Sequence, residues 1–97
     1  MTYADPAQRQ ELITGLRALA DFLASHPEVP APLYTDVLVF PPLGSDSARR
    51  REIDLIASRI GSGVGTCPIY CHYQTSRRFG PVEYRAVAIP KDETREQ

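Results

Sequence analysis

Three potential metal ligands, Cys67, Cys71 and His72, lie close together in the sequence. The segment around them is rich in aromatic and β-branched residues, and we expect it to form a strand. Residues four apart in a strand are separated by about 13 Å, at about 3.3 Å per residue. Zinc holds its sulfur ligands at about 2.3 Å, and a disulfide also needs close approach. We therefore expect no metal and no cofactor, and two free thiols.

No catalytic pattern is recognisable in the sequence. The two histidines, His26 and His72, lack the flanks of a hydrolase nucleophile, and no carboxylates are paired at a suggestive spacing. The glycines of residues 61–65 follow a predicted helix, whereas a phosphate-binding loop precedes one. We expect no catalytic residue and favour a protein that is not an enzyme.

Three consecutive arginines, Arg49, Arg50 and Arg51, could form a phosphate site or a solvated helix face. Asp46 and Asp54 lie four residues before and after Arg50, at the spacing of helical ion pairs. Consecutive helical residues diverge by about 100°, so the three side chains point around the helix. The solvated face is the favoured interpretation.

The stretch 67–90 predicts a β-hairpin around which the chain is organised. Its arms are residues 69–76 and 82–89, folded at residues 79–81. We expect odd positions to pair with odd positions, so that Arg77 meets Glu83 and Val87 and Ile89 lie on a mainly apolar face. The other face then carries Tyr70, His72, Tyr84, Ala86 and Ala88.

Two helices and one further strand complete the predicted elements. Helix 6–24 begins with Asp5 as its N-cap and Gln8 as the capping-box partner. Strand 34–40 follows a proline-rich connector, and its continuous apolar run indicates a central position in the sheet. Helix 47–60 is capped by Ser45 or Asp46. The first helix has an apolar stripe formed by Leu12, Leu16, Leu19 and Leu23.

The order of these elements, α-β-α-β-β, predicts the α+β class. We expect a three-stranded sheet with both helices on one face and the C-terminal hairpin within the sheet. The chain should form a single domain, residues 1–97, with residues 91–97 as a frayed tail. This arrangement leaves the second face of the sheet uncovered.

Composition narrows the class of protein further. The chain has 97 residues, of which 42% are hydrophobic, and this is enough for one domain with a modest core. No apolar run approaches the roughly 20 residues of a membrane span. The N-terminal segment is polar, without the apolar core of a signal peptide, so we expect a cytoplasmic protein. The net charge of −1 gives no general argument for binding nucleic acid.

Two segments resemble a known group of sequences. GLRALADFLASHPEVPAP, residues 15–32, and SRRFGPVEYRAVAIP, residues 76–90, look like small uncharacterised proteins of actinobacteria and of their phages and integrated elements. The resemblance covers most of the chain. It implies a cytoplasmic setting and allows an association with mobile DNA, but it carries no residue roles.

We therefore expect a non-catalytic interaction module that forms a homo-oligomer through the uncovered sheet face, because exposed apolar surface of this kind marks an interface. The first alternative is a nucleic-acid-binding protein. It would stack bases on the sheet aromatics and contact phosphates with Arg77, Arg78 and Arg85. The second alternative is a small enzyme or ligand-binding domain with a pocket between sheet and helices. No membrane partner is expected.

Overall fold

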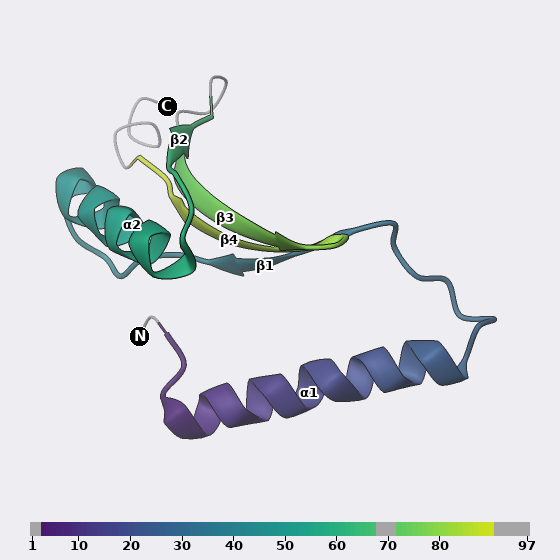
Figure 1. The fold of residues 1–97 in the computed structure, drawn as a ribbon. Coiled ribbons are helices and arrows are strands. Elements are labelled where there is room, and N and C mark those ends of the chain that lie inside the picture. Colours follow the sequence, from purple (N-terminus) through teal and green to yellow (C-terminus); the bar gives the residue numbers. More distant parts are fainter. Residues whose placement is uncertain (1–2, 68–71, 91–97) are drawn as a thin grey trace, which may run out of the picture. The chain divides into compact units, whose positions relative to one another are not determined.

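The computed structural model describes residues 3–67 and 72–90 and belongs to the α+β class (Figure 1). The elements in chain order are α1 (Pro6–Ser25), β1 (Thr35–Val39), α2 (Asp46–Ile60), β2 (Gly65–Thr66), β3 (Tyr73–Phe79) and β4 (Val82–Ala88). The chain divides into two compact units, one of residues 3–33 and the other beginning at Tyr34. Each unit is described by itself.

The first unit consists of α1 and the segments on either side of it. Its predicted capping box is confirmed: Gln8 N donates to Asp5 Oδ1 at 2.8 Å, and Asp5 N donates to Gln8 Oε1 at 2.9 Å. At the other end, the backbone N–H of His26 donates to Phe22 O, and the two rings stack with centroids 4.3 Å apart. None of the residues of α1 is buried.

The second unit contains a mixed sheet of four strands in the order β1-β4-β3-β2. The expected three strands were one too few, because Gly65 and Thr66 pair antiparallel with β3. The glycine-rich composition of this segment concealed the short strand, since glycine is depleted in strands. β1 runs parallel to β4, whereas β2, β3 and β4 are antiparallel neighbours.

β1 lies at the edge of the sheet, not in its centre as expected from its apolar run. Among the described strands it pairs only with β4. Val37 and Val39 are half-buried, whereas Leu38 remains exposed. The continuous apolar run gives β1 apolar side chains on both of its faces, but only the face with Val37 and Val39 is covered.

The turn of the hairpin is shorter than expected. Phe79 pairs directly with Val82, so Gly80 and Pro81 alone connect β3 to β4. Gly80 has a φ of 63°, a left-handed conformation that glycine adopts without a steric penalty. A turn of two residues pairs odd positions with even positions, and this shifts the whole register by one residue.

The expected pairing of odd with odd positions is therefore wrong. Arg77 lies opposite Tyr84 rather than Glu83, and Tyr73 lies opposite Ala88. The arms also differ from the expected ranges, because β3 begins at Tyr73 and extends to Phe79. Side chains that were expected on one face of β4 consequently lie on the other.

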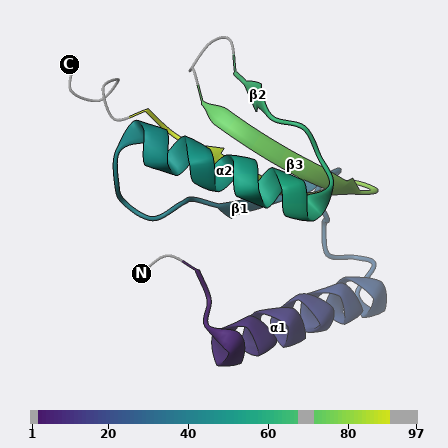
Figure 2. The same ribbon diagram turned by 60° about the vertical axis from the view of Figure 1, so that its left-hand side comes forward.

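α2 covers one face of this sheet (Figure 2). Its N-cap is Ser45, whose Oγ accepts a hydrogen bond from Ala48 N at 3.0 Å. Its C-cap is Gly61, in the left-handed conformation with a φ of 68°. The core beneath the helix contains Ile53, Ala86 and Ala88, with Val39, Ile56, Tyr73 and Tyr84 packed around them. The expectation that the first helix shares this face stays a prediction.

Candidate functional site

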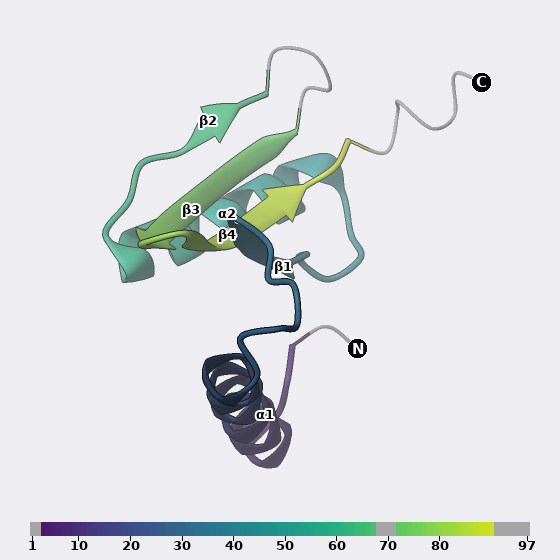
Figure 3. The same cartoon turned by 90° about the vertical axis from the view of Figure 1, so that its right-hand side faces the viewer.

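No described element of the second unit covers the other face of the sheet, which we call the open face (Figure 3). The alternation of side chains along paired strands defines its members. β4, one of the two interior strands, contributes Arg85 and Val87 to it, and β1 contributes Leu38 next to them. These residues surround a hollow of about 420 Å³, which is lined by Leu38, Phe40, Cys67, His72, Gln74, Arg85, Val87 and Ile89.

The centre of the open face is apolar and solvent-exposed. Leu38 is 50% exposed, Phe40 49% and Ile89 38%. Val87 lies between them and is only 6% exposed, so it forms the floor of the hollow. Leaving several large apolar side chains half in water costs free energy that contact with another apolar surface would recover.

One end of the open face carries charges. Arg85 Nη2 lies 3.0 Å from Glu83 Oε1, and Arg85 Nε lies 3.6 Å from Asp36 Oδ2. The pKa of Glu83 is lowered, chiefly by a hydrogen bond from Ser76 and then by Arg85. The open face is thus an apolar centre with a partly neutralised charged rim.

The observed register places the residues that were predicted for the uncovered face on two different faces of the sheet. Ala86 and Ala88 are buried beneath α2, and Tyr84 packs against them, so their expected position on the uncovered face is wrong. His72 lines the hollow of the open face. Tyr70 lies outside the described residues.

The three arginines expected to contact phosphate do not form one cluster. Arg85 is paired with carboxylates on the open face, and Arg78 lies opposite Glu83 in the register. Arg77 and Arg78 are consecutive in β3, so the side chain of Arg77 lies on the opposite face of the sheet from that of Arg78. The Arg77 guanidinium lies 5.3 Å from the centroid of the Phe79 ring. The three side chains therefore do not lie together, although Arg78 and Arg85 share the open face beside Glu83, and the phosphate contacts stay a prediction.

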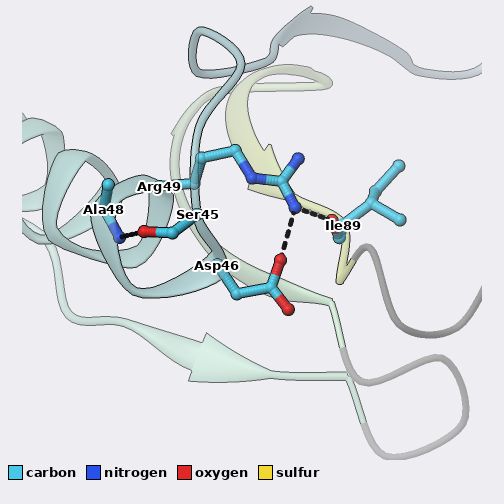
Figure 4. A network of polar contacts seen from close by, with 5 residues as sticks. All are labelled: Ser45, Asp46, Ala48, Arg49 and Ile89. Carbon is cyan, nitrogen blue, oxygen red and sulfur yellow. Dashed lines mark hydrogen bonds and ion pairs between the residues drawn. The ribbon is translucent and has the colours of Figure 1, made fainter.

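The arginines of α2 make structural contacts. Arg49 Nη2 donates to Asp46 Oδ1 at 2.8 Å and also to the carbonyl oxygen of Ile89, which ties the start of α2 to the end of β4 (Figure 4). The guanidinium of Arg50 lies 5.4 Å from the centroid of the Tyr73 ring. Arg50 and Arg51 are exposed, as the solvated-face interpretation expects, but this interpretation is wrong for Arg49, whose side chain is only 12% exposed. Asp46 pairs with Arg49 at i,i+3 and not with Arg50 at i,i+4.

A second polar contact joins α2 to β3. Tyr73 Oη donates to Asp54 Oδ1 at 2.5 Å. This hydrogen bond, with burial and the charge of Asp54 as smaller causes, raises the pKa of Tyr73 above its ordinary value. No other group that could serve as a base or nucleophile lies in the described contacts of this pair, and we assign it a structural role.

The geometric argument against a zinc site used a straight strand from Cys67 to Cys71, and this premise is wrong. Cys67 N donates to His72 O at 2.9 Å, and Cys67 follows β2, which is antiparallel to β3, so Cys67 does not continue the line of β3. Cys71 lies outside the described residues. Within residues 3–67 and 72–90, no group of three histidine, cysteine or acidic side chains could hold a metal.

Comparisons with family models, curated proteins and solved structures gave no match. Among the described residues, no helix combines the length and the apolar character of a membrane span. The candidate site therefore depends on the geometry of the open face alone.

Sequence reasoning missed the residues at the centre of the open face. Leu38 and Phe40 were attributed to a buried central strand, and Val87 and Ile89 to a face opposite the proposed interface. The dipeptide Gly80-Pro81 was the signal in the sequence that could have given the correct register. A hairpin with a turn of two residues pairs odd positions of one strand with even positions of the other.

Proposed function

We propose that the protein is a non-catalytic interaction module that self-associates through the open face of its sheet. The observation that supports this proposal most directly is the exposure of Leu38, Phe40 and Ile89 around one hollow. Contiguous exposed apolar side chains on a small domain are typical of an interaction site. The role assigned to the uncovered sheet face is retained, and His72 still belongs to this face, but Tyr84, Ala86 and Ala88 are replaced by Leu38, Phe40, Val87 and Ile89.

The distribution of polarity also supports a protein partner. The hollow at the centre of the open face is lined by Leu38, Phe40, Val87 and Ile89 together with four further side chains, and the ion pairs of Arg85 with Asp36 and Glu83 lie at one end. Protein interfaces commonly have an apolar centre and a polar rim. A phosphate-binding surface would instead present several unpaired cations, and Arg85 already has two carboxylate neighbours.

The proposal includes a cytoplasmic location, as the sequence analysis expects. The resemblance to actinobacterial and phage proteins stays a prediction. Nucleic-acid binding and a small-ligand site in the hollow are the alternatives that the experiments below are designed to detect.

A charge placed in the open face tests the proposal. Phe40→Glu should dissociate the oligomer, because association would bury a carboxylate without a partner. Leu43→Glu is the matched control, because Leu43 is 95% exposed and does not line the hollow. Size-exclusion chromatography with light scattering should show a monomer for the first variant and an unchanged oligomer for the second. Equal masses for the wild type and Phe40→Glu would reject the open face as the interface.

A further inference from the structure

The apolar stripe of α1 has no partner within its own unit. Leu12, Leu16 and Leu19 are all at least 45% exposed, and no residue of the helix is buried. Most helical stability in proteins comes from packing an apolar face, rather than from the propensity of single residues. The stripe therefore requires a complementary apolar surface.

The width of the stripe indicates what kind of surface it needs. Leu12, Leu16, Leu19 and Leu23 have the alternating spacing of four and three residues found in coiled coils. Coiled coils, however, flank this seam with charged residues, whereas the flanking positions here are Ile13, Gly15, Ala20 and Phe22. A broad stripe of this kind packs against a sheet or a bundle better than along a single helix.

The sheet of the second unit offers an apolar surface with a hollow on its open face. Its other face is covered over Ala86 and Ala88 by α2, and the exposed apolar side chains of that face, Phe79 and Val82, lie at its far end. The open face, by contrast, has exposed Leu38 and Phe40 around its hollow. A helix with a wide apolar stripe and a sheet face without cover are complementary in shape and chemistry.

Charge favours the same association. Residues 3–33 carry two arginines and four acidic side chains, a net charge of −2. Residues 34–90 carry seven arginines and five acidic side chains, a net charge of +2. Opposite net charges attract the two units and disfavour the pairing of two identical units, although on the open face itself Arg78 and Arg85 balance Asp36 and Glu83.

We propose that α1 of a second copy of this chain occupies the open face, and that the exchange is reciprocal. This inference rests on the proposed self-association and names the segment that each copy contributes. It replaces the expectation that both helices share one face of the sheet.

The connector between the units suits an exchange between copies. Pro27, Pro30 and Pro32 restrict the backbone of this segment, and Val29 N donates to His26 O at 3.0 Å in a turn at its start. A restricted connector limits the ways in which α1 can fold back on the sheet of its own chain. Swapping an element between identical chains keeps the same contacts and is a common route to dimers.

Photo-crosslinking in isotopically mixed dimers tests the proposal. A photo-crosslinking amino acid replaces Leu16 in a chain of natural isotopic composition, which we call the light chain. This chain is unfolded and refolded with an equimolar amount of the unmodified chain labelled with heavy nitrogen, which we call the heavy chain. After irradiation and trypsin digestion, peptide 10–17 should be joined to peptide 86–91, which contains Val87 and Ile89. The heavy form of peptide 86–91 should be captured as often as the light form, because the partner is drawn from either chain.

The same amino acid in place of Thr14 is the matched control. Thr14 lies in the same tryptic peptide, but it points away from the leucine stripe, so its crosslinks to peptide 86–91 should be lost. Capture of only the light peptide would show packing within one chain and overturn the exchange. A dimer without this crosslink from Leu16 would also overturn it, while the proposed self-association would survive. A monomer would reject both.

Discussion

Arg85 and Glu83 lie two residues apart on β4 and form an ion pair on the open face, with 3.0 Å between Nη2 and Oε1. Asp36 on the neighbouring strand approaches the same guanidinium. The cation that was expected to contact phosphate is therefore surrounded by carboxylates. This arrangement separates the protein-interface account from the nucleic-acid account in a testable way.

Nucleic-acid binding should be weak and insensitive to Arg85. We expect the wild type not to retard a single-stranded oligonucleotide in a gel at low salt, and Arg85→Ala to behave in the same way. Phosphate contacts release counterions, so true binding would be strongest at low salt and fall steeply as salt is added. Retardation that is lost in Arg77→Ala or Arg78→Ala would contradict this prediction and favour the alternative function.

The stability of the sheet should depend on the ionisation of Glu83. Its folded-state pKa is lowered, so its contribution is present above the unfolded-state pKa and is lost as the pH falls through the folded-state value. Glu83→Gln should therefore be less stable than the wild type at neutral pH, and the difference should vanish in acid. Urea unfolding from pH 7 down to the acid limit measures this difference. A difference that stays constant with pH would show that the charge of Glu83 has no stabilising role.

Tyr73 should ionise at a higher pH than an ordinary tyrosine, because its hydroxyl donates to Asp54. Removing the carboxylate in Asp54→Asn should lower this pKa, and the phenolate absorbance would report it, with Tyr73→Phe identifying the signal. The raised pKa also means that this contribution to stability is present at neutral pH and is lost as the pH rises through the folded-state value. Identical titrations of the wild type and Asp54→Asn would contradict the hydrogen bond.

The core beneath α2 should be sensitive to truncation. Ile53 is 0% exposed, and Ile53→Ala should destabilise the protein by about 2–5 kcal/mol, as large-to-small core substitutions do. Leu43→Ala is the control and should change the free energy of unfolding by less than about 0.5 kcal/mol. Denaturant titrations of both variants measure these effects. Equal losses would mean that the core is elsewhere.

Local signals in the sequence predicted the elements well but not their arrangement. The capping box of Asp5 and Gln8, the N-cap at Ser45 and the strands beside Gly80 follow from side-chain chemistry within a few residues. The position of β1 at the edge could not follow from its apolar run, because the same run also suits a central strand. Strand order depends on contacts between distant segments, which periodicity does not report.

The sequence predicted an uncovered sheet face as the candidate site, but it did not predict most of the residues that form this face. An uncovered sheet face was expected and is present in the second unit, yet Ala86 and Ala88 lie on the other side. A single residue in the length of the turn decides this, since a shift of one position moves every side chain of a strand to the opposite face. Apolar residues occur on both faces of β4, with Ala86 and Ala88 on one and Val87 on the other, so composition alone could not choose between them.

Sedimentation velocity of the wild-type chain over a wide range of concentrations tests the central claim most directly. The account predicts a reversible monomer–dimer equilibrium in which the dimer grows with concentration and persists as salt is raised, because burial of apolar side chains drives association. A single monomeric species at every concentration would contradict it.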